Sequence, residues 1–501
     1  MALLQRFVTA CASAPARAEI IDGIERVHHG ELLRRAAGLG LMLRQHDKSP
    51  EGHVGIFLPN IGAFPASLFG AMLGAKVPVP INILLQPKEV AFILQDAGIH
   101  TVLTISQFKP LFDQLGEHLP WEVNAICLDQ LPEAPAGVSP PPVSELIGHE
   151  TPDELACLIY TSGTTGNPKG VMLTYGNLEA NAEGSLRVLE YRQNEDIVLA
   201  QLPLFHSFGL MATLICPILD QVPLIMLARF NPTQLLRALE EHRVSAVCLV
   251  APMYGLLCRH PKIRETDLSA LRICVSGGGP LPTAIEQGWK ALTSLDLLNG
   301  YGLTEASPVV ANNAPWALKS GSIGKPLHNV EVIIRDPDGK PLPTGTEGEI
   351  CVRAPSVMRG YLNRPEDTAE AITPEGVLRT GDLGFMDEDG FLFITGRAKD
   401  LIITAGENIM PLEIENALQS HPAVMEVAVT GMPDEKKGEV PVAAIVRQPD
   451  AEVTAEELRA FLRGKIADYK IPRDFHFLEE LPKNTLNKVL KAQLREILEA
   501  E

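Results

Sequence analysis

The sequence lacks a cysteine framework. Its eight cysteines, spread over 501 residues, include no Cys-x-x-Cys pair, and most of them lie within apolar runs. A disulfide scaffold or a zinc site needs regular cysteine spacing, so the pattern argues against both classes. It predicts reduced cysteines in the core of a cytoplasmic protein.

An excess of positive charge and a long uninterrupted hydrophobic run are also missing. The formal net charge is −19, which argues against nucleic acid as a partner and favours a soluble protein. The most apolar long stretch, 209–228, contains two prolines and Asp220, so we expect it in the core and predict no transmembrane segment. Gln5, Arg6 and Thr9 interrupt the apolar run that a signal peptide needs. Peripheral contact with a membrane and the oligomeric state stay open.

The length of the chain sets a lower limit on the number of domains. A chain of 501 residues is too long for one hydrophobic core, because cores stop growing near about 250–300 residues. Within residues 1–125, short apolar segments such as 53–58 and 76–80 alternate with helical patterns such as 31–44. This alternation is typical of βαβ units and predicts a parallel sheet.

The functional interpretation begins with residues 160–170. Between the apolar runs 155–159 and 171–173, these eleven residues hold four aliphatic hydroxyl side chains, three glycines and Lys169. Glycine lets the backbone approach a ligand, and amides, hydroxyls and a lysine can bind anionic oxygens. We predict a strand–loop–strand phosphate site, with a plain turn as the alternative on composition alone. It is not a Walker loop, which needs glycine where Pro168 stands.

Two further segments carry candidate ligand-binding residues. The strand pattern 271–276 ends in Gly277, which permits close backbone approach at the carboxyl end of a parallel sheet; a simple turn fits equally well. Tyr301, Thr304 and Glu305 lie within five residues of one another. They offer a ring to stack on a base, a hydroxyl for a phosphate and a hard oxygen ligand for Mg²⁺.

The order of residues in 160–170 resembles the phosphate loop of the adenylate-forming enzymes. This superfamily includes acyl-CoA synthetases, luciferase-type enzymes and peptide-synthetase adenylation domains. Later segments are similar to further motifs of that family, in the family's order: 299–305 (Y-G-x-T-E), 378–384, 396–400 (G-R-x-K-D), 404–409 and 482–488. These segments together extend over nearly the whole chain beyond its N-terminal third.

The resemblance implies an α/β fold with two domains. The N-terminal domain, 1–395, would hold parallel-type sheets with helices plus a β-barrel-like subdomain, because 321–353 reads as β-rich. Residues 396–400 would form a hinge about which a small mobile α+β domain, 401–501, rotates between two half-reactions. In that domain Thr454 and Glu457 form a capping box that predicts a helix over 454–467.

The resemblance also implies ATP, Mg²⁺ and CoA as the molecules that bind beside a small carboxylic acid. The expected catalytic residues are Lys488, Thr304, Glu305 and Lys169, and Glu305 is the expected metal ligand. The expected nucleotide- and CoA-binding residues are Thr161, Ser162, Gly163, Thr164, Thr165, Gly166, Lys169, Gly278, Asn299, Gly300, Tyr301, Thr304, Asp382, Arg397, Lys399, Gly406 and Lys488.

Four of these residues have distinct implied roles. Lys169 would anchor the departing pyrophosphate, and Asp382, in a glycine-flanked turn, would accept both ribose hydroxyls. Arg397 would also donate to the ribose, whereas Lys488 would reach from the C-terminal domain to the reacting oxygens.

Asn487 stands where the family has glycine. Asparagine tolerates a left-handed backbone better than other non-glycine residues, so we expect the turn to form.

The acid pocket is expected around His206. In acyl- and aryl-CoA synthetases a similar Pro-Leu-Phe-His segment lines the carboxylate pocket, although a histidine between two phenylalanines is often a packed core residue. The other pocket candidates are small or apolar: Phe208, Val250, Ala251, Gly255 and Gly277–Gly279. An uncharged acyl tail is therefore expected. Peptide-synthetase domains place an aspartate here, and its absence disfavours amino acids.

We predict an ATP-dependent acid–CoA ligase that forms an acyl-adenylate with release of pyrophosphate and then transfers the acyl group to CoA. A medium- or long-chain fatty acid is the preferred substrate. Three alternatives stay open: an aryl or short acid–CoA ligase, an adenylating enzyme that loads a carrier protein, and a silent homologue that only binds acyl groups or nucleotides.

Overall fold

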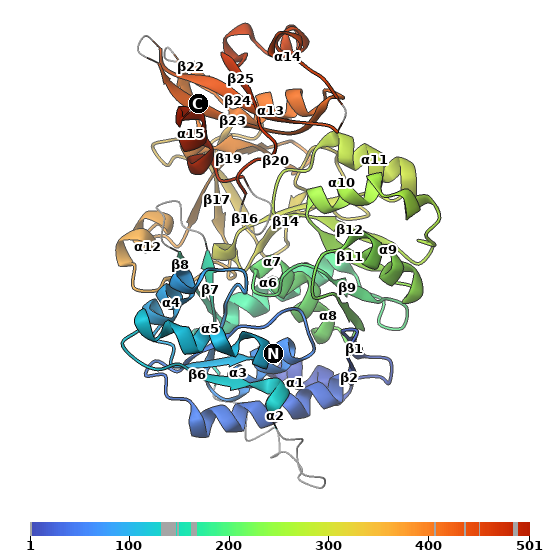
Figure 1. Ribbon diagram of the computed structural model, residues 1–501, viewed down its shortest axis with the longest axis vertical. Helices are drawn as coiled ribbons and strands as arrows, with labels where there is room; N and C mark the ends of the chain where they lie inside the picture. The colour runs from blue at the N-terminus through green and yellow to red at the C-terminus, as the bar shows by residue number, and fades with distance from the viewer. Residues whose placement is uncertain are drawn as a thin grey trace.

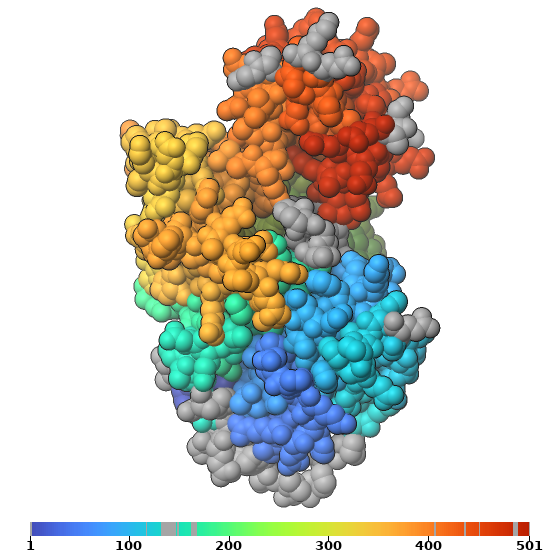
Figure 2. Space-filling model, turned by 90° about the vertical axis from the view of Figure 1, so that its left-hand side faces the viewer, coloured from blue at the N-terminus to red at the C-terminus, as the bar shows by residue number. Residues whose placement is uncertain are grey.

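The computed structural model of the chain is shown in Figure 1. It describes residues 3–131, 147, 150–161, 168–404, 407–434, 437–449, 451–483 and 489–500. The N-terminal part forms the lower body of the molecule, and the C-terminal unit stands above it. In the space-filling view of Figure 2 the red C-terminal residues lie at the top, above the blue and orange segments of the body.

The largest sheet has nine strands in the order β15-β14-β13-β12-β11-β9-β10-β1-β2. The six strands β13, β12, β11, β9, β10 and β1 run parallel to one another. At the two ends of the sheet, β2 is antiparallel to β1, β14 to β13, and β15 to β14. The strands are β1 (Glu19–Ile21), β2 (Arg26–His28), β9 (Val198–Ala200), β10 (Leu224–Met226), β11 (Ala246–Leu249), β12 (Ile273–Ser276), β13 (Leu298–Gly302), β14 (Val309–Asn312) and β15 (Lys325–Pro326).

Both faces of this sheet are buried, which explains its continuous apolar strands. Along β11, Val247 and Leu249 join one core cluster, whereas Ala246 and Cys248 join another. The first cluster is closed by the outer helices α9 (Pro232–Glu241), α10 (Ala251–Arg259) and α11 (Thr283–Thr293). The second is closed by inner helices: α1 (Leu3–Ala12), α2 (His29–His46), α3 (Ala63–Leu73), α6 (Tyr175–Leu189), α7 (Ser207–Leu210), the π-helix Met211–Ile215 and α8 (Cys216–Leu219).

A second, all-parallel sheet lies on the far side of the inner helices. Its strand order is β4-β3-β5-β6, with β3 (His53–Ile56), β4 (Val77–Pro80), β5 (Thr101–Thr104) and β6 (Asn124–Cys127). Helices α4 (Pro87–Asp96) and α5 (Lys109–Gln114) cover its outer face. Helix α3 is buried at every residue but its first, because it is enclosed between the two sheets.

Two antiparallel sheets complete the lower body. The first, β18-β8-β7, pairs β7 (Leu155–Thr161) with β8 (Lys169–Thr174) and β8 with β18 (Gly360–Tyr361). The second has the order β16-β17-β19-β20, with β16 (Glu331–Arg335), β17 (Gly348–Arg353), β19 (Leu378–Met386) and β20 (Leu392–Arg397). Helix α12 (Pro365–Ala371) lies between β18 and β19 in the chain.

The C-terminal unit is α+β. Its sheet contains β21 (Ile402–Thr404), β22 (Glu407–Ile409), β23 (Val424–Asp434), β24 (Gly438–Arg447) and β25 (Asp474–Phe477), and its helices are α13 (Pro411–Gln419), α14 (Ala455–Leu462) and α15 (Lys491–Ala500). The two apolar clusters of this unit draw only on residues after 401. The unit therefore has cores of its own.

Most sequence expectations about the fold agree with the structure. Most strands of the large sheet are parallel to their neighbours, and the sheet β4-β3-β5-β6 is wholly parallel. The stretch 209–228 is largely buried up to Met226, and all eight cysteines are free thiols. No helix in the described part of the chain is long and apolar enough to cross a membrane. The capping box at Thr454 and Glu457 is present.

Two expectations were wrong in detail. The helix predicted over 454–467 ends at Leu462, and Gly464, two residues later, has a φ of +79°, a conformation that ends helices. The β-rich region that was expected to be barrel-like is an open four-stranded sheet, since among the described residues its edge strands β16 and β20 do not pair with each other.

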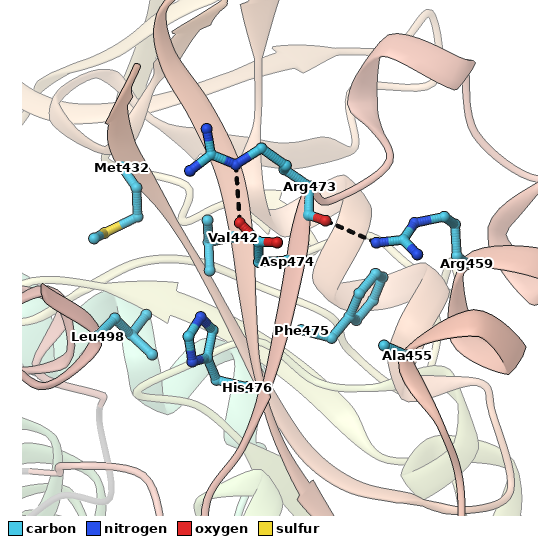
Figure 3. A pocket seen from close by; sticks show the side chains of 9 residues that line it. All are labelled: Met432, Val442, Ala455, Arg459, Arg473, Asp474, Phe475, His476 and Leu498. Atoms are coloured by element: carbon cyan, nitrogen blue, oxygen red, sulfur yellow. Dashed lines mark hydrogen bonds and ion pairs between the residues drawn. The ribbon is translucent and has the colours of Figure 1, made fainter. Parts of the chain in front are cut away.

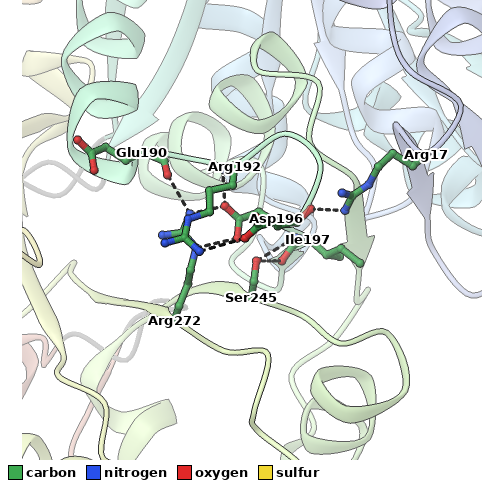
Figure 4. A network of polar contacts seen from close by, with 8 residues as sticks. Arg17, Glu190, Arg192, Asp196, Ile197, Ser245 and Arg272 are labelled. Atoms are coloured by element: carbon green, nitrogen blue, oxygen red, sulfur yellow. Dashed lines mark hydrogen bonds and ion pairs between the residues drawn. The ribbon is translucent and has the colours of Figure 1, made fainter.

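An ion pair between Asp196 and Arg272 connects the amino ends of two strands of the large sheet, β9 and β12 (Figure 4). Asp196, which is 1% exposed, precedes β9 and accepts hydrogen bonds from Arg272 Nε (2.8 Å) and the Arg192 N–H (2.6 Å). Arg272, which precedes β12, also donates to the Glu190 carbonyl at 2.8 Å, and Arg17 donates to the Asp196 carbonyl at 2.8 Å. Burial alone would raise the pKa of Asp196, but the hydrogen bonds from Arg272 and Arg192 outweigh it and lower that pKa.

Arg272→Ala should lower the free energy of unfolding by about 3–5 kcal/mol, because it leaves a buried carboxylate unpaired. The carboxylate stabilises the fold above its unfolded pKa of about 3.9, and this contribution disappears as pH falls through the lower folded pKa. The loss in the variant should therefore be large at pH 7 and shrink towards pH 3. Urea unfolding at several pH values measures it.

Arg237→Ala is the matched control, because Arg237 forms an exposed ion pair with Glu241. Such a pair contributes about 0–1 kcal/mol. Equal destabilisation by the two variants would contradict the role of Asp196 and Arg272 as a clamp.

Candidate active site

The candidate site lies at the carboxyl edge of the large sheet. Parallel strands end at the same edge, so the segments that follow β9, β11, β12 and β13 come together there. These segments carry His206, Val250, Gly277 and Thr304, and Ser276 on β12 pairs with Asn299 on β13. The sheet thus brings together residues that are separated by up to about a hundred positions in the chain.

The half of the site that is expected to bind the acid contains Gly277 and Phe208. A side chain at Gly277 would place its Cβ 3.1 Å from two atoms of the Phe208 ring, so the ring lies directly on the glycine backbone. Val250 is buried and lies beside Gly278, whose Cβ would be 3.5 Å from Val250 Cγ1. Gly255, also a pocket candidate, packs instead against Ile285 of α11. The floor of this half is therefore apolar and uncharged.

His206 adds a polar group to this apolar half. Burial lowers its pKa from 6.5 to about 4, so the imidazole is neutral at physiological pH. Its ring lies 4.8 Å from the Phe205 ring, and its Nε2 is buried without a hydrogen-bond partner among the described residues. A buried polar atom without a partner is costly, and a bound ligand is one way to satisfy it.

Other unsatisfied polar atoms lie at the same edge. Ser276 Oγ and Asn299 Oδ1 are buried and find no partner within the described residues. Thr304, by contrast, shares a 3.0 Å hydrogen bond with Ser207 Oγ, which ties η7 (Thr304–Ala306) to the histidine segment. Gly300 permits a close approach, because a Cβ there would lie 2.0 Å from Asn312 Oδ1.

A buried charge cluster joins the large sheet to the antiparallel sheet β16-β17-β19-β20. Asp382, which is 4% exposed, accepts a hydrogen bond from the Tyr301 hydroxyl at 2.6 Å. It also forms an ion pair with Arg397, whose Nε lies 2.7 Å from Oδ1. Burial, followed by the charge of Asp382, raises the pKa of Tyr301, so its hydroxyl remains a donor. Asp382 was expected in a glycine-flanked turn, but it lies within β19, directly opposite Arg397 on β20. The turn assignment was wrong because Gly381 is accommodated within the strand with a φ of +70°.

A second cluster connects the strand after the phosphate loop with the expected metal ligand. Lys169 Nζ lies 2.9 Å from Asp367 Oδ1 and 5.1 Å from the centre of the Tyr361 ring. The Tyr361 hydroxyl donates to Glu305 Oε1 at 2.8 Å. Thr161, at the end of β7, donates to the Lys169 carbonyl at 3.5 Å. Lys169 and Glu305 are therefore held on either side of one tyrosine.

Several predicted residues lie outside the described part of the chain. They are Ser162, Gly163, Thr164, Thr165, Gly166, Gly406 and Lys488, together with Asn487. Lys399 is described, and it is an exposed residue of η8 (Ala398–Asp400), between a strand of the body and the first strand of the C-terminal unit. Next to it, Asp400 lies 3.6 Å from Lys491 of α15, which also contacts Glu415 of α13 at 3.2 Å.

A separate hollow of about 430 Å³ opens on the C-terminal unit, around the edge strand β25 (Figure 3). Arg459 and Arg473 lie at its rim. Arg459 donates to the Arg473 carbonyl at 2.7 Å, and Arg473 contacts Asp474 and Asp434 at 2.8 Å. The charge of Arg473 is thus neutralised locally, and none of the residues that line the hollow was predicted for the site.

Sequence reasoning missed Ser207, Tyr361 and Asp367. Ser207 stands inside the segment that was singled out for His206, so its hydroxyl could have been noted. Tyr361 and Asp367 come close to Lys169 only because β18 pairs with β8, nearly two hundred positions earlier. No local pattern in the sequence indicates that pairing.

Comparison with known proteins identifies the family. The family model described as AMP-binding enzyme matches residues 7–362, and that of the AMP-binding enzyme C-terminal domain matches residues 413–488. The chain is 34% identical to a long-chain-fatty-acid–CoA ligase of Bacillus subtilis, over 93% of this chain and 89% of the relative. It is 35% identical to a feruloyl-CoA synthase of Amycolatopsis, over 96% of both chains.

The fold comparison agrees with the family match. The ATP-bound structure of MatB from Rhodopseudomonas palustris superposes with a TM-score of 0.88 at 27% identity, over 99% of both chains. The likeness extends through both parts of the chain, including the segment 363–412 that lies between the two matched regions. The chain belongs to the AMP-binding enzymes, the adenylate-forming superfamily that its motifs resemble.

Proposed function

We propose that the protein is an ATP-dependent acid–CoA ligase whose preferred substrate is a medium- or long-chain fatty acid. The observation that carries this proposal is the division of the site into two halves. Charged pairs, Asp382 with Arg397 and Lys169 with Asp367, make up one half, and the apolar surface of Phe208 against Gly277 makes up the other. A nucleotide fits the first half and an uncharged acyl tail the second.

The reaction has two steps. A carboxylate oxygen of the acid attacks the α-phosphorus of ATP, and the bond between that phosphorus and the bridging oxygen breaks, so that pyrophosphate leaves and an acyl-adenylate forms. The sulfur of CoA then attacks the acyl carbon, AMP leaves, and the thiol proton is released. Positioning and charge neutralisation contribute most to such chemistry. Lys169 would hold the pyrophosphate, and Lys488 would neutralise charge at the reacting oxygens.

Glu305 fits the role of a Mg²⁺ ligand. One carboxylate oxygen of Glu305 accepts a hydrogen bond from the Tyr361 hydroxyl, and the carboxylate retains further lone pairs for a hard cation. Within the described residues, no group of three or more His, Cys, Asp or Glu side chains could hold a metal ion. Mg²⁺ is usually held by one or two carboxylates plus substrate phosphates, so a single carboxylate beside the phosphates suits it. The ion would neutralise phosphate charge.

An aryl acid is the second candidate substrate. The fatty-acid ligase and the feruloyl-CoA synthase are 34% and 35% identical to this chain, so sequence identity does not separate an alkyl from an aryl acid. The flat Phe208 ring on Gly277 could pack against either. The apolar, uncharged contact of Phe208 with Gly277 favours the alkyl chain.

The CoA half-reaction is proposed to depend on rotation about residues 396–400. Arg397 is paired with Asp382 in the body, whereas Asp400 contacts Lys491 in the C-terminal unit. The strand end at Arg397 is thus fixed to the body, and η8, which follows it, is fixed to the C-terminal unit through Asp400. Gly406, which lies outside the described residues, would leave room for the pantetheine arm of CoA, and Lys399 would lie at the turning point.

A pyrophosphate-release screen tests the substrate. With ATP, Mg²⁺ and CoA, octanoate and palmitate should give kcat/KM values about tenfold or more above those of 4-coumarate and ferulate, because one or more methylenes in an apolar pocket contribute about 1–3 kcal/mol. The reverse order would assign the protein to aryl acids. Release that needs a holo-carrier protein in place of CoA would assign it to carrier loading, and no release with any acid would support the silent homologue.

Asp382→Asn should abolish discrimination between ATP and 2′-deoxy-ATP. A hydrogen bond to a charged group contributes about 1.5–3 kcal/mol, so wild-type protein should bind 2′-deoxy-ATP about tenfold to a hundredfold more weakly than ATP. The variant should bind both nucleotides equally in calorimetry. Asp338→Asn, at an exposed turn, is the control. An unchanged ratio in Asp382→Asn would contradict its role as the ribose ligand.

Lys488→Ala should slow acyl-adenylate formation by about a hundredfold to a thousandfold, the usual effect of removing one group that stabilises developing charge. Thioester formation from supplied acyl-adenylate and CoA should be nearly unchanged, because Lys488 would act only in the first step. Rapid-quench assays of the two half-reactions measure this. Lys340→Ala, at an exposed turn, should affect neither. Equal loss in both half-reactions would contradict the assignment.

A further inference from the structure

The lysine of the phosphate site already has a counterion in this structure. Lys169 Nζ lies 2.9 Å from Asp367 Oδ1, and the side chains are only 19% and 32% exposed. The ammonium also lies 5.1 Å from the centre of the Tyr361 ring, a distance at which the face of a ring attracts a cation. The group that is proposed to anchor pyrophosphate is thus occupied by a carboxylate.

Asp367 is held in this position by the same strand that carries the lysine. Gly360 and Tyr361 of β18 pair with β8, and the Leu362 N–H donates to the Gly170 carbonyl at 2.8 Å. Thr368, the residue after Asp367, accepts a hydrogen bond from the Tyr361 N–H at 2.9 Å. The first turn of α12 is therefore fastened to β18, and β18 to β8.

Tyr361 extends this arrangement to the expected metal ligand. Its hydroxyl donates to Glu305 Oε1 at 2.8 Å. Burial, and then the charge of Glu305, raise the pKa of Tyr361, so the hydroxyl is protonated at any working pH. One residue thus contacts both groups that would meet the phosphates, Lys169 through its ring and Glu305 through its hydroxyl.

We propose that Asp367 is a positioning residue that acts as a resident anion, which holds Lys169 in place until the triphosphate displaces it and which recaptures Lys169 as pyrophosphate leaves. This inference rests on the proposed role of Lys169 as the phosphate anchor. A carboxylate beside the lysine competes with phosphate oxygens for the same ammonium and repels them as well. Asp367 therefore weakens ATP binding and favours release of pyrophosphate.

The strength of the pair sets the size of the effect. A partly exposed lysine–carboxylate pair with a well-placed partner contributes about 0.4–1 kcal/mol, which corresponds to a factor of about 2 to 5 in an equilibrium constant. Removing the competing charge should therefore tighten nucleotide binding about twofold to fivefold. The inhibition constant for pyrophosphate should fall by the same factor, because both ligands displace the same carboxylate.

The test compares Asp367→Asn with Glu366→Gln. Glu366 is an exposed neighbour on the same helix, so its variant removes the same charge without touching Lys169. Calorimetry on the full-length protein, without acid or CoA, gives the dissociation constant of the α,β-methylene analogue of ATP with Mg²⁺. The same titration is run on Lys169→Met with and without Asp367→Asn.

We expect Asp367→Asn to bind the nucleotide analogue about twofold to fivefold more tightly than wild type, and Glu366→Gln to bind it as wild type does. In Lys169→Met, adding Asp367→Asn should leave the dissociation constant unchanged. Unchanged or weaker binding in Asp367→Asn would overturn the inference, as would an equal gain in Glu366→Gln. A wild-type protein that binds no nucleotide would instead overturn the proposed function. The two failures are therefore distinguishable.

Discussion

The buried carboxylate of Asp382 is the contact on which the geometry of the site depends. A charge with so little access to water needs partners, and it has two: the Tyr301 hydroxyl from the large sheet and the Arg397 guanidinium from the four-stranded sheet. Removing either would leave a buried charge partly unpaired. The two sheets are therefore held in one relative position at the point where the nucleoside is proposed to bind.

The sequence predicted the elements of the site better than their meeting points. The strands on either side of the loop, 155–159 and 171–173, could be assigned because apolar runs and turn residues act locally. The segment 299–305 was found because Tyr301, Thr304 and Glu305 lie close together in the sequence and resemble a family motif. Asp382 was misplaced because glycine beside an acidic residue usually marks a turn, whereas Gly381 here lies inside a strand. Tyr361 and Asp367 were missed because their contact with Lys169 depends on strand pairing between distant segments, which no local pattern encodes.

The C-terminal unit has hydrophobic cores separate from those of the body. Its clusters of buried side chains contain no residue from before position 402. Lys491 joins the last helix to Asp400 and to Glu415 of α13, so the ends of the unit are fastened to each other and to η8. A rotation at 396–400 would not expose these cores, which keeps its energetic cost low.

The separation of a charged half from an uncharged half has an evolutionary consequence. Phe208, Val250 and Gly277 would shape the proposed acid pocket through apolar surface and backbone alone. Among the described residues, none of the three forms a hydrogen bond or ion pair with the charged side chains of the other half. Substitutions among them after gene duplication can change which acid fits while the adenylating chemistry is retained. A scaffold of this kind can acquire new substrates through substitutions at a few uncharged positions.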